Sequence, residues 1–292
     1  MEHRAGFVNI LGKPNVGKST LMNRMVGEKL SIITSKAQTT RHRIMGIVNE
    51  DDYQVVFSDT PGILDPTYKL QEAMLKAARS ALVDADVLIY MIEAGEKPDP
   101  DLVILQKVAK INTPVLLIIN KIDLSDQEKV VKFMEAWQKL LPKAEIIPIS
   151  AKVNFNVKAV FERILHHLPV SPPYYPKDTL TDKSERFFAG EMIREKILMQ
   201  YKQEIPYSVE IEIDAFKEDD KLIRISAIIY VEREGQKGIL IGNEGKALKK
   251  VGRESRIDME EFFLKKVFLE LKVKVQKDWR NNERQIKKFG YH

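Results

Sequence analysis

The pattern GKPNVGKS at residues 12–19 constrains this 292-residue chain more than any other feature. It matches G-x-x-x-x-G-K-[ST], in which the two glycines let the backbone bend so that several N–H groups point at one anion. An apolar run, Phe7–Leu11, precedes it and a helix-like stretch, Thr20–Val26, follows it, so the positive end of a helix reaches the same point. The pattern therefore predicts a site for nucleotide phosphates between a strand and a helix.

The residues of this phosphate loop have separate predicted roles. Lys18 supplies a full charge for the β- and γ-phosphates, and the Ser19 hydroxyl is placed to bind Mg²⁺. Asn15 is a candidate for holding a monovalent cation such as K⁺ beside the phosphates. The other residues predicted to contact the nucleotide here are Gly12, Val16, Gly17 and Thr20.

The length suggests two domains, at roughly 150 residues each. With 44% hydrophobic and 30% charged residues the composition is that of a globular protein, and no apolar run approaches the ~20 residues of a membrane span. The absence of cysteine excludes disulfides and thiol catalysis. We expect a cytoplasmic monomer without a signal peptide.

Strand-like and helix-like patterns alternate through the first 168 residues, which predicts a doubly wound, mostly parallel six-stranded α/β sheet. The short link between the second and third strands indicates a hairpin and one antiparallel edge strand. The expected strands are Phe7–Leu11, Ile44–Asn49, Gln54–Ser58, Val87–Ile92, Val115–Asn120 and Ile146–Pro148. The expected helices are Lys18–Val26, Tyr68–Val83, Asp99–Lys110, Asp126–Leu141 and Val157–His167.

Two further segments fit a γ-phosphate and its metal. The sequence DTPG at residues 59–62 follows a strand, so that Asp59 can hold Mg²⁺ through water and the Gly62 N–H can reach the phosphate. In QTTR at residues 38–41 a threonine hydroxyl can complete the Mg²⁺ shell, and we favour Thr40 over Thr39. Lys18, Thr40 and Gly62 are thus expected to assist hydrolysis.

The residue after DTPG is Ile63, where many GTPases carry a glutamine that orients the attacking water. An apolar side chain cannot orient water. No catalytic residue is therefore assigned, and we predict slow intrinsic hydrolysis.

The sequence NKID at residues 120–123 closes a strand and identifies the base as guanine. Asp123 can accept hydrogen bonds from the guanine N1–H and exocyclic amine, a donor pair that adenine lacks, and this disfavours an ATP-dependent kinase. The Lys121 stem can lie over the base, and Asn120 can tie this segment to the phosphate loop. Backbone donors toward the guanine O6 are expected from Ser150, Ala151 and Lys152.

A Pro-rich stretch at residues 171–180 predicts a linker between a domain at 1–170 and a second at 181–292. In the second we expect a helix over Thr181–Tyr201, a hairpin of Tyr207–Lys217 and Leu222–Arg233, and a C-terminal helix. Positive charge concentrates at the end of the chain, because residues 237–292 carry 15 Lys and Arg against 8 Asp and Glu. Such a basic region favours a polyanionic partner.

The sequence GNEG at residues 242–245 follows a strand-like run, Ile239–Ile241, and precedes a basic helix. This is the form of a KH module of type II, in which a GXXG loop admits a nucleic-acid backbone beside a groove for unstacked bases. A second GxxG, at residues 235–238, is interpreted as a turn. Helices are expected over Lys246–Arg253 and Asp258–Leu264, and a strand over Val267–Val275. The candidate RNA-binding residues are Ile241, Gly242, Asn243, Glu244, Gly245, Lys246, Lys249, Lys250 and Arg253.

The motifs GKPNVGKST, QTTRH, DTPG, NKID and SAK, followed by one GNEG-bearing domain, resemble the Era family of bacterial GTPases over nearly the whole chain. The resemblance implies a GTP/GDP switch in ribosome assembly that binds the 3′ end of 16S ribosomal RNA in the 30S subunit. It also implies peripheral association with a membrane. An alternative stays open, in which the basic domain of a nucleotide-gated scaffold binds protein or anionic lipid instead of a specific RNA.

Overall fold

The computed structural model describes residues 2–99 and 103–291. The chain forms two compact units, of which the first extends to residue 66 and includes 74–182, and the second contains 67–73 and the residues from 183 onward. The Pro-rich segment predicted as a linker thus belongs by its contacts to the first unit. Within the described residues, no helix has both the length and the apolar character needed to cross a bilayer.

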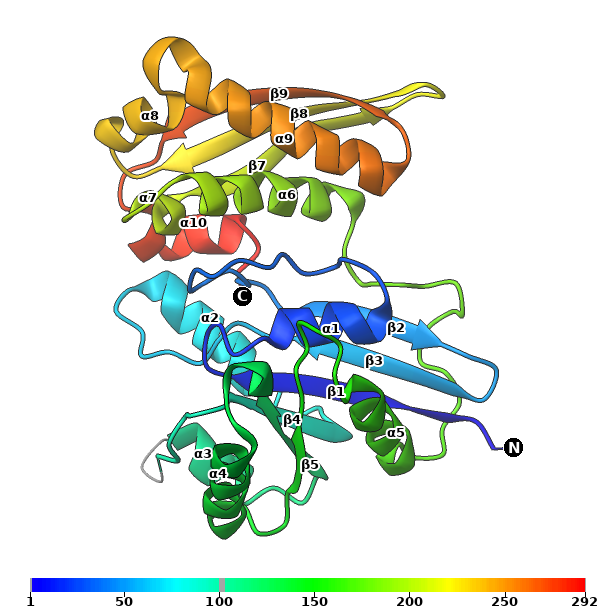
Figure 1. Ribbon diagram of the computed structural model, residues 1–292. Helices are drawn as coiled ribbons and strands as arrows, with labels where there is room; N and C mark the ends of the chain where they lie inside the picture. Colours follow the sequence, from blue (N-terminus) through cyan, green and yellow to red (C-terminus); the bar gives the residue numbers. More distant parts are fainter. Residues whose placement is uncertain (1, 100–102, 292) are drawn as a thin grey trace. The chain divides into compact units, whose positions relative to one another are not determined.

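The first unit is a six-stranded sheet in the order β2-β3-β1-β4-β5-β6, and all neighbours are parallel except β2 and β3 (Figure 1). The predicted hairpin and antiparallel edge strand are therefore confirmed. The strands are β1 (Arg4–Gly12), β2 (Ile44–Asn49), β3 (Tyr53–Asp59), β4 (Val87–Glu93), β5 (Val115–Asn120) and β6 (Glu145–Pro148).

Helices cover both faces of this sheet, which explains why its central strands are continuous apolar runs. On one face a buried cluster joins the sheet to α2, α3 and α4 and includes Tyr90 and Trp137. On the other, α1 contacts α5, and Phe161 of α5 packs against Phe57 of β3. The helices are α1 (Lys18–Val26), α2 (Lys69–Ser80), α3 (Val103–Val108), α4 (Gln127–Leu140) and α5 (Val157–His167), with a short 3₁₀ helix η1 (Ile122–Leu124) after β5. Residues 100–102 of the predicted helix Asp99–Lys110 lie outside the described residues.

The carboxyl ends of the parallel strands meet at one edge of the sheet. The register aligns Ile10 with Asp59 and Glu93 with Asn120. DTPG and NKID begin at Asp59 and Asn120, and the phosphate loop begins two residues after Ile10, so motifs distant in sequence lie at one edge.

The segment before the second unit lies along the edge strand β2. Thr181 forms an antiparallel bridge with Gly46, and the Leu180 carbonyl accepts a hydrogen bond from Ile47 N at 2.8 Å. The buried Gln54 side chain accepts from the backbone N–H groups of Tyr174 and Tyr175. The exposed hydrogen-bonding groups of an edge strand are in this way used within the chain.

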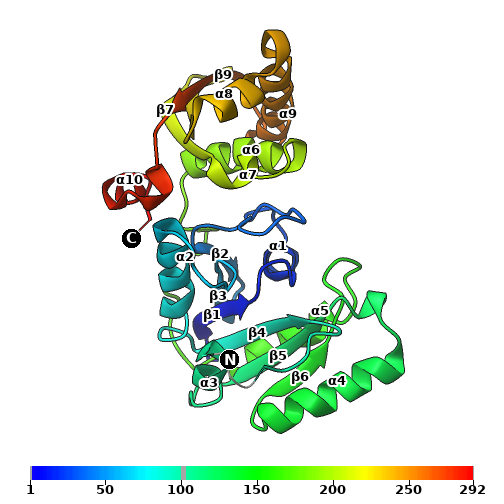
Figure 2. The same cartoon turned by 90° about the vertical axis from the view of Figure 1, so that its left-hand side faces the viewer.

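The second unit is a three-stranded sheet in the order β7-β8-β9, with β7 antiparallel and β9 parallel to β8. Helices α6 and α9 pack together, α6 against β7 and α9 against β9 (Figure 2). The predicted KH fold of type II is confirmed. Its elements are α6 (Glu185–Gln200), α7 (Ile205–Ser208), β7 (Glu210–Glu218), β8 (Leu222–Val231), α8 (Glu234–Ile241), η2 (Asn243–Gly245), α9 (Lys246–Phe263), β9 (Lys266–Val275), η3 (Trp279–Asn281) and α10 (Glu283–Lys288).

Four local predictions in this unit were wrong. The run Ile239–Ile241, expected as a strand, and the GxxG at 235–238, expected as a turn, both lie in α8. Residues 246–263 form one helix, not two, because the tertiary fold tolerates Gly252 in its interior, where the glycine lies close to Leu271 of β9. Helix α6 begins later than Thr181, since Ser184 is the N-cap and accepts a hydrogen bond from Phe187 N.

Candidate functional site

The phosphate loop packs so closely against β4 and β5 that its two glycines have no room for side chains. A Cβ atom on Gly12 would lie 2.2 Å from the Met91 carbonyl oxygen, and one on Gly17 would lie 2.2 Å from Asn120 Nδ2. Both glycines also have positive φ, 153° and 108°. The loop opens into a cavity of about 1020 Å³.

Lys18, the first residue of α1, is buried with its ammonium group among backbone carbonyls. Its Nζ donates to the oxygens of Gly12 and Lys13, at 3.1 and 2.9 Å. Burial lowers the pKa of Lys18 to about 8, although the nearby Asp59 carboxylate opposes this shift. A phosphate group at this point would favour the charged form of the lysine and so raise its pKa.

Three oxygen-bearing side chains converge beside Lys18. Ser19 Oγ lies 2.6 Å from Asp59 Oδ2 and 2.9 Å from Thr40 Oγ1, and Thr40 Oγ1 lies 3.2 Å from the same carboxylate oxygen. Burial raises the pKa of Asp59, while the charge of Lys18 opposes this shift. The Oδ1 atom of Asp59 is buried without a hydrogen-bond partner. Two hydroxyls and one carboxylate form a hard-oxygen set of the kind that Mg²⁺ prefers, so these residues fit the predicted metal. Thr39 also lines the cavity, but its hydroxyl donates to the Lys36 carbonyl at 2.6 Å and is not part of this set.

The backbone of the DTPG segment packs closely against the phosphate loop, and the side chain of the next residue, Ile63, is buried. A Cβ on Gly62 would lie 2.7 Å from Pro14, so the segment packs directly on the phosphate loop. Ile63 is only 9% exposed and belongs to the core cluster between the sheet and α2, α3 and α4. Its side chain is therefore part of the core, whereas the sequence showed only that it is apolar.

Asn120 joins three motifs. Its Nδ2 donates to the Val16 carbonyl of the phosphate loop at 2.7 Å, and its Oδ1 accepts from Ala151 N at 2.9 Å. Lys121 has a left-handed backbone and its ammonium pairs with Glu93 at the end of β4. Asp123 is exposed and lines the cavity.

The SAK segment is held by internal hydrogen bonds. Ser150 N donates to the Phe155 carbonyl at 3.1 Å, and Ala151 N donates to Asn120. Two of the three expected backbone donors therefore have partners inside the protein. The Lys152 carbonyl accepts from Arg24 of α1, a contact that the sequence did not indicate.

Most of the predicted nucleotide residues reach the cavity, and the others support them. Gly12, Val16, Asp59 and Ala151 stand behind the lining and hold Lys18, Asn120 and Ser19. Sequence reasoning missed several lining residues, among them Asn23, Arg24 and Glu93. Glu93 had a usable signal, since it ends a strand at the edge where the motifs meet. The predicted residues that line the cavity are Asn15, Gly17, Lys18, Ser19, Thr20, Thr40, Gly62, Asn120, Lys121, Asp123, Ser150 and Lys152.

In the second unit the GNEG loop connects α8 to α9 as a tight, irregular turn. Gly242 has φ 69° and ψ 178°, and a Cβ there would lie 2.6 Å from the Ala247 methyl group. Glu244 and Gly245 also have positive φ, but nothing lies within 4 Å of a Cβ on Gly245. The loop is thus a real GXXG turn before a helix, and its middle residues are exposed.

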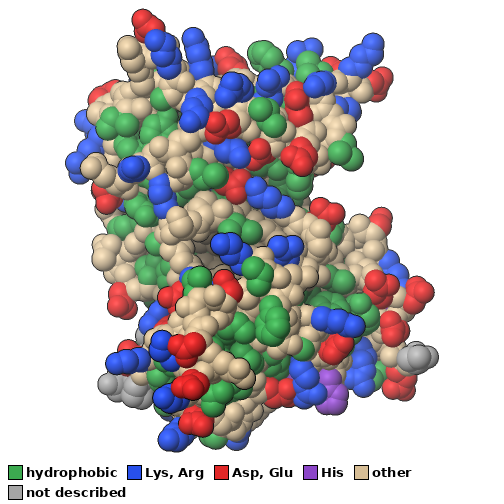
Figure 3. Space-filling view, in the orientation of Figure 1, with side chains coloured by type: hydrophobic (Ala, Val, Ile, Leu, Met, Phe, Trp, Pro, Cys, Tyr) green, Lys and Arg blue, Asp and Glu red, His purple; other side chains and the backbone are tan. Residues whose placement is uncertain are grey.

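The basic residues of this region point into solvent. Lys246, Lys249, Lys250 and Arg253 are all exposed along the first two turns of α9. Lys246 pairs with Glu244 at 2.9 Å, and Lys250 lies 3.9 Å from Glu254. Lys and Arg side chains stand along the rim of this unit in Figure 3. These cationic side chains are therefore accessible to a polyanion without a change in the loop.

The first unit has the fold and the loop geometry of a P-loop GTPase, and the second has the topology of a KH module. Family models agree: residues 7–121 match the model described as 50S ribosome-binding GTPase, and residues 204–280 match the KH domain.

Full-length relatives narrow the assignment. GTPase Era of Syntrophus aciditrophicus (strain SB) is 48% identical over 292 residues, covering 99% of this chain and 95% of that protein. A crystal structure of Era in complex with MgGDPNP and nucleotides 1506–1542 of 16S ribosomal RNA matches with a TM-score of 0.95 and 40% identity, covering 99% of both chains. A variant of Aquifex aeolicus Era bound to GDP and AlF₄⁻ matches with a TM-score of 0.94, 40% identity and the same coverage. The chain belongs to the Era family of GTPases.

Proposed function

We propose that the chain binds GTP with Mg²⁺, hydrolyses it slowly, and uses its nucleotide state to control binding of the 3′ end of 16S ribosomal RNA during assembly of the 30S subunit. One observation carries the nucleotide part: the oxygens of Ser19, Thr40 and Asp59 converge beside the buried Lys18 in a single large cavity. The structural similarity to Era in complex with MgGDPNP and RNA supports the rest.

In this proposal the phosphate loop supplies backbone N–H groups, and Lys18 leaves its two carbonyl partners for the β- and γ-phosphates. Ser19 and Thr40 would hold Mg²⁺ directly and Asp59 would hold it through water. The bound ion would neutralise charge on the phosphate oxygens. Of the three residues, Thr40 is the one that belongs to a loop, and we propose that its hydroxyl reaches Mg²⁺ only when the γ-phosphate of GTP is present.

The exposed Asp123 carboxylate recognises the guanine donors, with Asn120 holding the loop and Lys121 covering the base. We expect Asp123→Asn to shift preference from GTP toward XTP, because the amide presents an N–H where the carboxylate accepted one. Competition binding of GTP and XTP to the wild type and the variant measures this. An unchanged preference would contradict the base contact.

Hydrolysis needs a water held by something other than the residue after DTPG, because Ile63 is in the core. The backbone of Gly62 is one candidate. K⁺ held near Asn15, whose Nδ2 donates to the Ser35 carbonyl at 2.9 Å, is the other part of the proposal. GTPase rates in matched K⁺ and Na⁺ buffers test it, and equal rates would remove the cation from the mechanism.

For the second unit we propose that single-stranded RNA lies across the GNEG loop with its phosphates near the basic residues of α9. The exposure of Asn243, Glu244 and the four cationic side chains supports this arrangement. GTP is expected to favour RNA binding and hydrolysis to favour release, so by linkage RNA raises the affinity for GTP over GDP.

The experiment measures binding of the full chain to an RNA with the sequence of nucleotides 1506–1542 of 16S ribosomal RNA and to a scrambled RNA of equal length. Substitution of Gly242 and Gly245 by Asp should abolish binding while GTP affinity survives. The chain offers a matched control in the second GxxG: Gly235 and Gly238 lie in α8 with nothing within 4 Å of a Cβ atom. Replacing them by Asp adds the same charge and should change RNA binding far less. Equal loss in both variants, or equal binding of the scrambled RNA, would contradict the proposal.

A further inference from the structure

The loop that carries Thr40 is fixed at its amino-terminal end by one side chain of α1. Asn23 Oδ1 accepts hydrogen bonds from the backbone N–H groups of Leu30 and Ser31 at 3.1 and 3.0 Å. Its Nδ2 donates to the Ser31 carbonyl at 2.7 Å. Leu30 and Ser31 are buried, so this part of the loop is held by packing as well as by hydrogen bonds.

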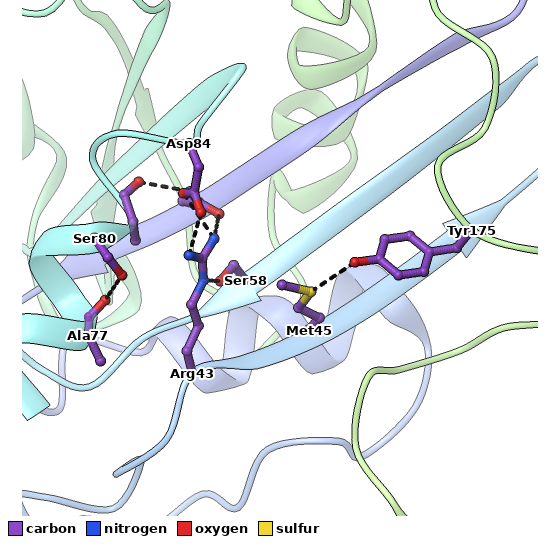
Figure 4. Close-up of polar contacts among 9 residues, drawn as sticks. Arg43, Met45, Ser58, Ala77, Ser80, Asp84 and Tyr175 are labelled. Carbon is purple, nitrogen blue, oxygen red and sulfur yellow. Dashed lines mark hydrogen bonds and ion pairs between the residues drawn. The ribbon is translucent and has the colours of Figure 1, made fainter. Parts of the chain in front are cut away.

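At the carboxyl-terminal end the loop is fixed by Arg43. Its Nη1 and Nη2 reach the two carboxylate oxygens of Asp84 at 2.6 and 3.0 Å, and its Nε donates to Ser58 Oγ at 2.5 Å. Nη2 also donates to Oδ1 of the buried Asn9 at 3.0 Å. In Figure 4 the guanidinium of Arg43 points between Asp84 and Ser58, away from Met45. One side chain therefore ties the loop to β1, to β3 and to the turn before β4.

Beyond Arg43 the chain is fixed by further contacts. Met45 N donates to Asp182 Oδ1 at 3.0 Å, its carbonyl accepts from Thr181 Oγ1 at 2.7 Å, and its sulfur faces the Tyr175 hydroxyl (Figure 4). Strand β2 is also paired with β3 along its whole length. A displacement of Thr40 thus meets a rigid segment only three residues further along.

We propose that Arg43 is a positioning residue, which fixes the end of the loop so that Thr40 stays beside Ser19 and Asp59, and that Asn23 and Arg43 together confine nucleotide-dependent movement to residues 32–42. The physical reason is the short separation along the chain. With Arg43 anchored, Thr40 lies three residues from a fixed point, so less conformational entropy is lost when its hydroxyl is ordered at the metal site. The inference rests on the proposed Mg²⁺–GTP site.

The test compares dissociation of a fluorescent, non-hydrolysable GTP analogue and of fluorescent GDP from the wild type and from Arg43→Gln, in excess Mg²⁺. Because the proposed contact of Thr40 with Mg²⁺ forms only when a γ-phosphate is present, the variant should release the GTP analogue roughly tenfold faster, the size expected for losing charge-assisted hydrogen bonds. GDP release should change little. Asp84→Asn removes half of the ion pair and should give a smaller effect of the same kind, which keeps the test valid if Arg43→Gln folds poorly.

Arg79→Gln is the matched control, since Arg79 is an exposed arginine in the last turn of α2. It should leave both dissociation rates unchanged. Equal acceleration of GTP analogue and GDP release in Arg43→Gln would assign the residue a purely structural role and overturn the inference. Unchanged rates would overturn it as well. If the wild type itself failed to bind the GTP analogue, the proposed function would fail first, so the two failures are distinguishable.

Hydrogen exchange locates the moving segment. Between the GDP and GTP-analogue states of the wild type, protection should change at backbone amides of residues 32–42 and stay constant over β2. In Arg43→Gln the change should extend into the first residues of β2. A wild-type change that already spans β2 would contradict the boundary.

Discussion

The phosphate loop and the GNEG loop both depend on glycines, but they differ in how closely neighbouring atoms surround those glycines. In the phosphate loop both glycines are enforced by backbone or side-chain atoms 2.2 Å from a would-be Cβ, and the loop is bonded to two further motifs through Asn120. In the GNEG loop only Gly242 is crowded, at 2.6 Å from the Ala247 methyl group, while Gly245 faces open space.

The difference reflects the ligand each loop is proposed to meet. A nucleotide triphosphate is small and needs many donors held in one geometry, so the site is buried and its parts support one another. An RNA strand is long and is bound through repeated phosphate contacts at an exposed surface, so each side chain acts nearly alone. Substitutions should therefore have large, coupled effects in the first unit and small, separable effects in the second.

The largest expected effect comes from Gly17→Ala. The new methyl group would displace the Asn120 amide and strain a backbone with φ 108°, so nucleotide affinity should fall by roughly a hundredfold or more. Gly245→Ala is the paired variant: it should cost about 1 kcal/mol of local strain and leave GTP affinity unchanged. Isothermal titration with GDP checks both. Similar losses of GDP affinity in the two variants would break the comparison.

Ile63→Gln tests whether a glutamine at this buried position can promote GTP hydrolysis. Installing the glutamine of other GTPases should not raise the hydrolysis rate, because the side chain enters the core and not the cavity. It should lower the free energy of unfolding by about 1–3 kcal/mol, since an amide is buried without a partner. Phosphate release and chemical denaturation measure the two quantities, and Ile63→Val separates loss of volume from burial of the amide. A faster variant of unchanged stability would show that position 63 faces the nucleotide.

A smaller effect is expected from protonation of Lys18, whose pKa burial lowers to about 8. Phosphates favour its charged form, so binding should take up protons, and affinity should fall by at most tenfold per unit as pH rises above about 8. In the ligand-free protein the unfolded chain keeps this proton up to its ordinary pKa of 10.5, so Lys18 alone makes stability rise with pH between these values. Titration in two buffers of different ionisation enthalpy measures the uptake. Lys18→Met should abolish it, and an uptake that persisted in the variant would come from another group.

The smallest effect is expected on the basic surface of α9. Lys249→Gln removes one exposed charge, so RNA affinity should fall only a few-fold. The slope of log affinity against log salt concentration should become shallower by about one. GTP binding should be unaffected. Binding to the ribosomal RNA fragment at several salt concentrations measures both values, and a loss as large as that of Gly17→Ala would show that this surface is not built from independent contacts.

Local patterns predicted the first unit well, because each strand and helix there has a consistent pattern over its own length. Helices α1 and α5 have the predicted bounds, and the hairpin of β2 and β3 is confirmed. The second unit was harder. The run Ile239–Ile241 is apolar and short, and such a run does not distinguish a strand from the last turn of a helix. Only its packing, with Leu240 fully buried, decides that it is helical.

The sequence by itself determined the chemistry of this protein: GKPNVGKS, DTPG and NKID specify their local turns through glycines and through donors and acceptors within a few residues. The tertiary structure decided what holds them. Asn120 between Val16 and Ala151, Thr40 beside Ser19, and Arg43 against Asn9, Ser58 and Asp84 are contacts between residues far apart in the chain. Their formation depends on strand order and register, which arise from burial of the whole sheet and not from any single segment.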